Sequence, residues 1–176
     1  MKTSNLLKSI IVLTAICLVV SGALALTNSV TAPVIEAEKI ARETAGRQAL
    51  LPDAAQFLPL DEAVASVTAA HKGISDKGEL VGYVFTAISK GFDSNITVMC
   101  AIDANGSVIR VRTIDVSGET KTLGGLTASQ EYTDQYIGTN CRLDGVDAIS
   151  GATITSEAYE DCVLQCYCAF EQVKEK

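Results

Sequence analysis

The sequence contains no tryptophan, a single histidine and only three prolines among 176 residues, and aromatic residues make up just 5% of it. With His71 as the sole imidazole, a metal site built on histidines is not expected. Basic residues are also scarce, with 14 Lys and Arg against 21 Asp and Glu, which gives a formal net charge of -7. Because the chain has this charge and no basic stripe, a nucleic-acid partner is not expected either.

Several cofactor motifs are missing as well. No Cys-x-x-Cys pair occurs, and the spacing of Cys162, Cys166 and Cys168 fits neither a zinc site nor an iron–sulfur cluster. No glycine-rich nucleotide-binding fingerprint is present. We therefore expect the chain to bind no metal and no NAD by itself. Five cysteines follow Cys17, and this odd number predicts no complete disulfide framework.

A long apolar run lies close to the N-terminus. Residues 9–26 carry no charge, and 18 residues are near the minimum for crossing a bilayer, where about 20 are usual. Lys2 and Lys8 precede the run and the next basic residues come well after it, so we expect a cytoplasmic N-terminus and an exported remainder. We predict a retained transmembrane anchor at residues 1–27. The alternative is a signal peptide cleaved near residues 23–25, which would also export the chain.

Downstream of the anchor, residues 28–60 are interpreted as a linker and a helix. Apolar residues recur at helical spacing from Ile35 to Leu51. Pro33 lies just before this stretch and Pro52 just after it, and prolines are typical of helix boundaries.

The remaining residues, 61–176, are predicted to form one α+β domain with a small antiparallel sheet and flanking helices. Segments rich in β-branched and aromatic residues predict strands at 80–88, 95–102 and 107–116. The last two strands are expected to form a hairpin, because Asn105-Gly106 between them is a strong two-residue turn signal. A short helix is predicted at residues 129–137. A longer one is predicted from Ser156 to Lys174, where apolar residues recur every three or four positions.

The helical spacing divides the cysteines of this last helix. Cys162 and Cys166 lie on its apolar stripe, and we interpret them as small core residues rather than redox groups. Cys168 lies off the stripe and is expected to be exposed.

A loop of small and hydroxyl-bearing residues, Asp-Ala-Ile-Ser-Gly-Ala-Thr-Ile-Thr-Ser, occupies residues 147–156 and leads into the last helix. Unpaired backbone N–H groups and the positive end of the dipole at a helix start favour a phosphate. Gly151 and Ala152 let a bulky group approach the backbone closely. An ordinary helix cap has a similar composition, so composition alone leaves phosphate binding and simple capping as alternatives.

The order of residues 147–153 resembles the signature of FMN-binding domains that are modified by a flavin transferase. In that family the threonine after Gly-Ala is joined to the FMN phosphate by a phosphoester bond, and here this position is Thr153. The resemblance is greatest to the G subunit of the Rnf electron-transport complex, followed by the C subunit of the sodium-translocating NADH:quinone reductase. Residues 48–57, 82–85 and 96–103 are similar to further segments of these proteins.

The resemblance also implies the rest of the cofactor site. Around the phosphate it points to Ser150, Gly151, Ala152, Thr155 and Ser156 beside the covalently modified Thr153. The segment 119–124 is similar to a family loop that reads Glu-Thr-Pro-Gly-Leu-Gly and packs against the flavin ring. The expected ring contacts are Glu119, Thr120, Leu123 and Gly124. Lys121 and Thr122 replace the family's Pro and Gly, and no catalytic residue and no metal ligand are implied.

The function implied is that of an electron-transfer subunit, with covalent FMN, in a membrane-bound ion-translocating ferredoxin:NAD oxidoreductase. Such a subunit has no complete active site of its own. Its partners would be the other membrane subunits and a flavin transferase. It would cross the cell's inner membrane once and place its C-terminal domain outside the cytoplasm. Two alternatives remain open: a stand-alone extracytoplasmic flavoprotein reductase, and a non-redox binding module anchored in the envelope.

Overall fold

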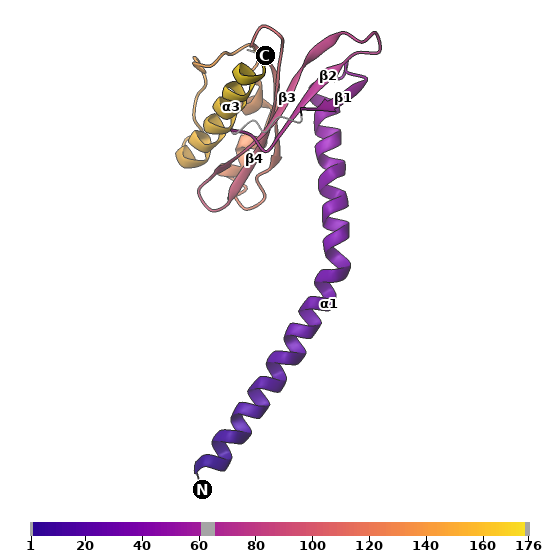
Figure 1. The fold of residues 1–176 in the computed structure, drawn as a ribbon. Helices are drawn as coiled ribbons and strands as arrows, with labels where there is room; N and C mark the ends of the chain where they lie inside the picture. Colours follow the sequence, from indigo (N-terminus) through magenta and orange to yellow (C-terminus); the bar gives the residue numbers. More distant parts are fainter. Residues whose placement is uncertain (1, 61–65, 175–176) are drawn as a thin grey trace. The chain divides into compact units, whose positions relative to one another are not determined.

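The structure is a computed structural model that describes residues 2–60 and 66–174, with side chains from residue 7 onward (Figure 1). The chain divides into two compact units, Met1–Arg42 and Glu43–Lys176. The first unit is helical, and the second contains the sheet and the remaining helices.

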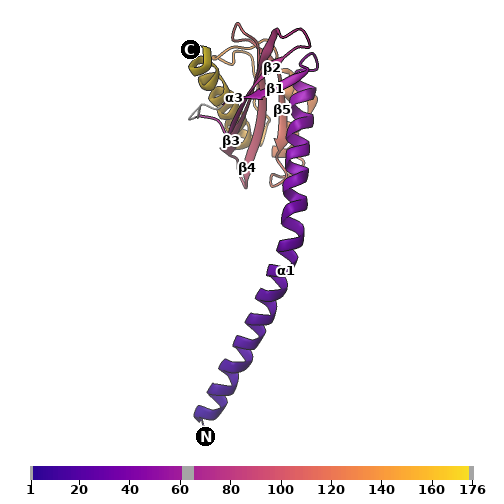
Figure 2. The same cartoon turned by 45° about the vertical axis from the view of Figure 1, so that its right-hand side comes forward.

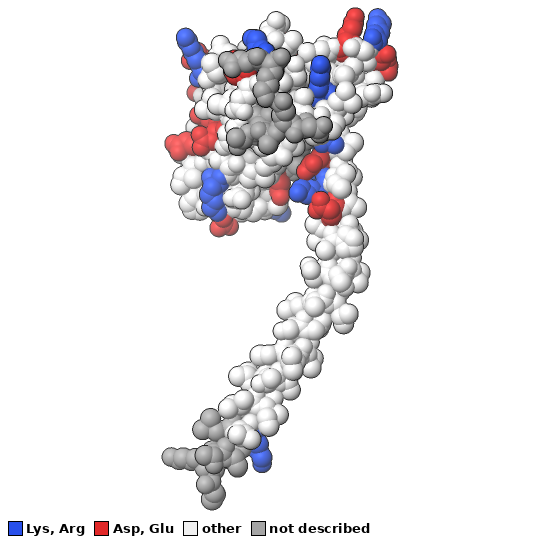
Figure 3. All heavy atoms as spheres, in the orientation of Figure 1, with Lys and Arg blue, Asp and Glu red and all other residues white. Residues whose placement is uncertain are grey.

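Helix α1 runs without interruption from Lys2 to Leu50. Its stretch from Leu7 has a window of mean hydropathy 2.6 with none of its residues buried, so the helix is long and apolar enough to cross a membrane. Figure 3 shows no Lys, Arg, Asp or Glu side chains along the middle of this helix. A signal sequence would have the same length and composition.

The prediction that a separate helix begins after Pro33 is wrong, because Pro33 lies inside α1. A proline in a helix interior removes one backbone hydrogen bond but does not always end the helix. The hydroxyls of the preceding turns bond back to helix carbonyls, for example from Thr27 to Ala23 and from Thr31 to Thr27, both at 3.0 Å. These side chains satisfy their polar atoms within the helix, as an apolar environment requires.

The second unit is built on a five-stranded antiparallel sheet with the strand order β1-β2-β3-β4-β5. The strands are β1 (Gln56–Pro59), β2 (Ala69–Ile74), β3 (Leu80–Lys90), β4 (Asn95–Ile102) and β5 (Val108–Asp115). The three strands predicted from the sequence correspond to β3, β4 and β5, and the predicted fold class is confirmed. β1 and β2 were not predicted, because they are short and carry few β-branched residues.

The β4–β5 hairpin turns where Asn105-Gly106 predicts it. The Asp103 carboxylate accepts hydrogen bonds from the N–H groups of Asn105, at 2.9 Å, and Ser107, at 2.8 Å. Gly106 has a φ of 90°, a left-handed conformation that glycine adopts without strain. This turn sets the register of the two strands.

Helix α3 (Thr153–Lys174) covers one face of the sheet and packs on β3 and β4 (Figure 2). The main core lies between them and includes Phe85, Val98, Tyr159 and Phe170, all at most 1% exposed. A smaller cluster on the other face joins the last turn of α1 to Val84, Met99 and Ala101. β3 and β4 are therefore buried on both faces, which makes them a rigid base for the loops at their ends.

Short helical segments precede α3. They are the 3₁₀ turn η1 (Gly124–Ala128) and the helix α2 (Gln130–Asp134). Tyr132 of α2 packs edge-on against Tyr159 of α3 with ring centroids 5.3 Å apart, and its hydroxyl lies 3.1 Å from that of Tyr136. This aromatic contact anchors α2 against the first half of α3.

The structure places the three cysteines of α3 as their helical spacing predicts. Cys100, Cys162 and Cys166 are buried free thiols, whereas Cys141 and Cys168 are exposed. Burial raises the pKa of the Cys162 thiol to about 12, and burial and the adjacent Cys100 thiol raise the pKa of Cys166 well above its ordinary value. The interpretation of Cys162 and Cys166 as core residues is confirmed.

We expect a thiol reagent to modify Cys141 and Cys168 in the folded protein, and the buried cysteines only after unfolding. The reacting species is the thiolate, which burial suppresses. Peptide mass spectrometry after labelling in detergent, with and without denaturant, measures this difference. Rapid labelling of Cys166 in the folded protein would contradict the packing of α3 on β4.

Candidate functional site

The loop that carries the predicted motif folds back onto the first turn of α3. The Ser156 hydroxyl accepts a hydrogen bond from the N–H of Ile149 at 3.0 Å, and the Ser156 N–H donates to the carbonyl of Ala152 at 2.9 Å. Gly151, with a φ of 80°, makes the sharp turn before the helix. Thr153 is the first residue of α3, and it is exposed. The loop geometry thus presents the Thr153 side chain to solvent at a helix N-terminus.

A pocket of about 360 Å³ opens beside Thr153. Eight of the ten predicted site residues line it: Glu119, Thr120, Leu123, Gly124, Gly151, Ala152, Thr153 and Thr155. Ser150 and Ser156 are not among the lining residues, and Ser156 is buried with its hydroxyl bonded to the loop. The structure therefore brings together two predicted segments that lie about thirty residues apart in the sequence.

Two further residues line the pocket that sequence reasoning missed, Phe92 and Ile154. Phe92 lies in the turn between β3 and β4, where an aromatic residue flanked by Gly91 and Asp93 is an unusual choice. That composition was the only signal for it in the sequence. Ile154 follows Thr153 directly and is an apolar residue left exposed in the first turn of a helix.

The pocket is rimmed by large apolar side chains that remain exposed. Phe92 is 69% exposed, Leu123 41% and Ile154 51%. Exposed apolar side chains gathered around one concavity are typical of a binding site. Apolar side chains of this kind pack against a flat ring system, and the helix N-terminus at Thr153 favours a phosphate. The residues present thus suit both ends of a flavin mononucleotide.

Glu119 connects three segments of the pocket wall. It is only 6% exposed. Its Oε1 accepts hydrogen bonds from the N–H groups of Asp93, at 3.0 Å, and Ser94, at 3.1 Å. Its Oε2 accepts one from the Thr155 hydroxyl at 2.8 Å. The carboxylate therefore joins the loop after β5, the turn that carries Phe92 and the first turn of α3.

Two opposing effects act on the ionisation of Glu119. Burial, the largest effect, raises the pKa of this carboxyl group. The hydrogen bonds from Ser94, Thr155 and Asp93, together with the charge of Lys90, more than offset it, so that the pKa lies below its ordinary value. Glu119 is therefore an anion at neutral pH.

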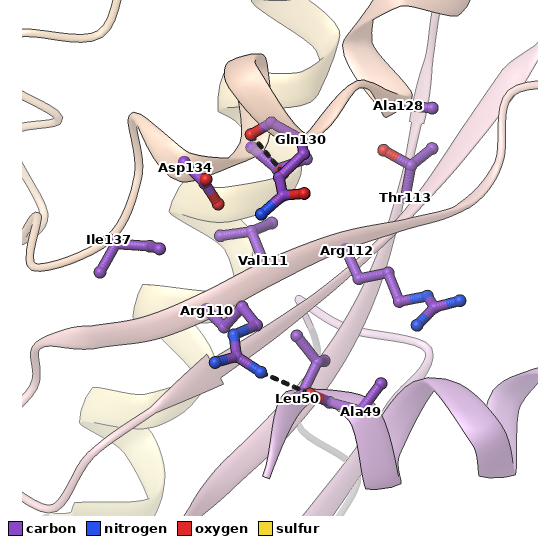
Figure 4. Close-up of a pocket in the computed structure, with 11 residues that line it drawn as sticks. Ala49, Leu50, Arg110, Val111, Arg112, Thr113, Ala128, Gln130, Asp134 and Ile137 are labelled. Carbon is purple, nitrogen blue, oxygen red and sulfur yellow. Dashed lines mark hydrogen bonds between the residues drawn. The ribbon is translucent and has the colours of Figure 1, made fainter. Parts of the chain in front are cut away.

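A larger groove, of about 650 Å³, lies along β5 (Figure 4). Its lining includes Arg110 and Arg112, and the Arg110 guanidinium donates to the carbonyl of Ala49 at 2.8 Å. This contact caps the end of α1. The groove contains none of the residues predicted from the motif, and its size alone does not favour it over the smaller, apolar pocket at Thr153.

No group of three potential metal ligands occurs among residues 2–60 and 66–174.

Comparisons with known proteins bear on the pocket at Thr153. The model of the FMN-binding domain family matches residues 91–167. The chain is 32% identical over 174 residues to the G subunit of the Na(+)-translocating ferredoxin:NAD(+) oxidoreductase complex of Acetobacterium woodii, and the match covers 84% of this chain and 83% of that protein. The chain belongs to the family of Rnf complex G subunits. It is also 29% identical over 173 residues to the G subunit of the ion-translocating oxidoreductase complex of Methanosarcina acetivorans, with 92% of each chain covered.

Structural comparison supports the fold. The crystal structure of Shewanella oneidensis NqrC superposes with a TM-score of 0.53 over 72% of this chain and 74% of that one, at 18% sequence identity. At this identity the likeness shows a shared fold alone. Membership of the Rnf family confirms the resemblance drawn from residues 147–153, and the FMN-binding domain confirms FMN as the cofactor. A flavin electron carrier is the role that fits both findings.

Proposed function

We propose that this Rnf family member carries FMN as a phosphoester of Thr153. It passes electrons within a membrane-bound, ion-translocating ferredoxin:NAD oxidoreductase complex. The observation that carries the proposal is the exposed Thr153 hydroxyl at the N-terminus of α3, beside a pocket with an apolar rim. Bound FMN supplies the electron-accepting and electron-donating chemistry.

The residues of the pocket and of the loop at Thr153 have different parts in this proposal. The first-turn N–H groups of α3 and the Thr153 oxygen hold the phosphate. Phe92, Leu123 and Ile154 exclude water from the ring. Small residues leave space for the group, namely Gly124, Gly151 and Ala152. Thr120 and Thr155 lie on the pocket wall, whereas Ser150 and Ser156 shape the loop around the attachment point.

The attachment itself needs a partner enzyme. A threonine hydroxyl is a weak nucleophile without a neighbouring base, and no histidine or cysteine is among the described residues that line the pocket at Thr153. The carboxylate of Glu119, the one acidic side chain among the described lining residues, is bonded to Thr155 and two backbone N–H groups. A flavin transferase would move the FMN phosphoryl group from FAD to the Thr153 oxygen. The hydroxyl loses its proton, the pyrophosphate bond breaks and AMP leaves.

The membrane arrangement follows from the charge pattern. We propose that residues 1–27 are the anchor and residues 61–176 the FMN-binding domain, with the N-terminus in the cytoplasm and the domain outside it. Residues 28–60 contain the rest of α1 and the strand β1 rather than a linker and a separate helix. The residues matched by the FMN-binding family, 91–167, lie inside the last segment. The partner subunits would supply the ferredoxin and NAD sites, for which this chain has no motif.

Protease treatment tests this arrangement. We expect the domain to be digested when protease is added to spheroplasts, and to be protected in inverted inner-membrane vesicles, because positive charge before the anchor retains the N-terminus in the cytoplasm. Detergent-permeabilised vesicles serve as the control for cleavage. Protection in spheroplasts would place the domain in the cytoplasm and rule out this arrangement.

Intact mass tests the function. The full chain produced together with its transferase should gain the mass of an FMN phosphoester, and its yellow colour should survive denaturation. Co-purification with several integral membrane subunits should accompany it. A bare polypeptide mass would exclude the covalent carrier and favour a helix-capping loop in a non-redox module. An adduct without any partner subunit would favour a stand-alone reductase.

A further inference from the structure

We propose that Glu119 is a positioning residue whose fixed negative charge in the pocket wall lowers the reduction potential of the flavin. The proposal rests on the proposed function, because it requires FMN to occupy the pocket at Thr153. Its basis is the way the surrounding residues fix the Glu119 carboxylate and leave it without a direct cationic partner.

The hydrogen-bond pattern identifies the charge state. The two Glu119 oxygens accept from three donors, namely two backbone N–H groups and the Thr155 hydroxyl. An ionised carboxylate is an acceptor only, so this pattern suits the anion. Among residues 7–60 and 66–174, no basic side chain forms an ion pair with Glu119 within 4.0 Å. Lys90 lies nearby, but its ammonium donates to the carbonyl of Asp93 at 2.9 Å.

The carboxylate is also fixed in place. A Cβ on Gly91 would lie 2.6 Å from its Oε1, and a Cβ on Gly124 would lie 2.7 Å from its Oε2. Both glycines are buried. A side chain at either glycine would therefore displace the Glu119 side chain. The backbone at both positions lies close to the carboxylate and encloses it from two sides. This close packing and the three hydrogen bonds favour one position of the carboxylate.

The effect on a bound flavin follows from charge balance. Two electrons and one proton convert the neutral oxidised ring into an anionic reduced ring, and a second proton neutralises it. A fixed anion at the pocket wall opposes the gain of negative charge, and it does so more strongly in a partly buried site than in water. Glu119 therefore makes reduction less favourable, which lowers the midpoint potential.

The competing explanation is that Glu119 only stabilises the pocket wall through its hydrogen bonds. Glu119→Gln separates the two roles, because glutamine has the same shape and can keep the contacts. Its carbonyl oxygen accepts from Asp93 and Ser94, and its amide donates to the Thr155 oxygen. The variant removes the charge and retains the hydrogen bonds that stabilise the pocket wall. Glu171→Gln is the matched control, because Glu171 is exposed near the end of α3 and loses the same formal charge.

The experiment measures intact mass and flavin midpoint potential for the full chain made with its transferase and purified in detergent. We expect the FMN adduct in all variants, a more positive potential in Glu119→Gln and no change in Glu171→Gln. An unchanged potential in Glu119→Gln with FMN attached would overturn the charge proposal. Absence of the adduct from the unmodified sequence would instead refute the proposed function.

A second variant keeps the test decisive if Glu119→Gln fails to fold. Thr155→Val removes one hydrogen-bond donor to the carboxylate but leaves its charge. It therefore weakens the hydrogen bonding of Glu119 without changing the charge of the pocket wall. We expect its potential to become more negative, because the Thr155 hydroxyl no longer offsets part of the carboxylate's charge. An unchanged potential or a positive shift in Thr155→Val would mean that the charge proposal is wrong.

Discussion

Thr153→Ala should leave the purified chain without any covalent FMN, and electron transfer through the complex should be lost with it. The reason is that the phosphoester oxygen is the threonine hydroxyl itself, and no neighbouring group can replace it at the same position. Ser156 is buried and bonded to Ile149, and Thr155 is buried and bonded to Glu119. Intact mass of the full chain, made with its transferase, measures the loss.

Two variants control for effects on folding. Thr153→Val keeps the side-chain shape and should also lose the adduct, whereas Thr153→Ser keeps the hydroxyl and should retain at least part of it. Thr153 is exposed, and surface substitutions usually change stability by no more than about 0.5 kcal/mol, so the thermal transition should change little. An FMN adduct that persists in Thr153→Ala would place the attachment site elsewhere and contradict the proposed function.

Glu119→Ala should lower the free energy of unfolding of the domain by about 2–4 kcal/mol. Hydrogen bonds to a charged acceptor contribute about 1.5–3 kcal/mol each, and the side chain accepts three of them. The turn at Asp93 and Ser94 is partly exposed, so water can accept hydrogen bonds from these two N–H groups in the variant, and the loss of stability is smaller than the sum. The turn that carries Phe92 also loses its connection to α3, so flavin attachment should be slower than in the unchanged sequence.

Denaturant titration of the full chain in detergent measures this effect, with Glu171→Ala as the control. Glu171 is an exposed helix residue, and surface substitutions of this kind usually change stability by no more than about 0.5 kcal/mol. If the free energies of unfolding of Glu119→Ala and Glu171→Ala differed by less than about 0.5 kcal/mol, Glu119 would not join the three segments. Glu119→Gln should lie close to the unchanged sequence, because its contacts are retained.

Local sequence patterns predicted much of the fold. The strands β3, β4 and β5 and the helix α3 were predicted because each contains enough apolar residues at one spacing to identify its type. Pro33 misled the prediction, because a proline marks a helix boundary only statistically, and α1 continues through it. β1 and β2 are short strands that depend on pairing with β3 for their stability, and such pairing leaves little trace in a local pattern.

By itself, the sequence determined the class of cofactor and pointed to Thr153 as the attachment residue, because the motif that carries both is one contiguous segment. Only the tertiary structure decided which residues form the pocket. Phe92 comes from a turn between two strands, and Glu119 bonds to residues 25, 26 and 36 positions away along the chain. Such contacts exist only after the sheet and α3 have packed together, since burial and hydrogen bonding between distant segments depend on the whole fold.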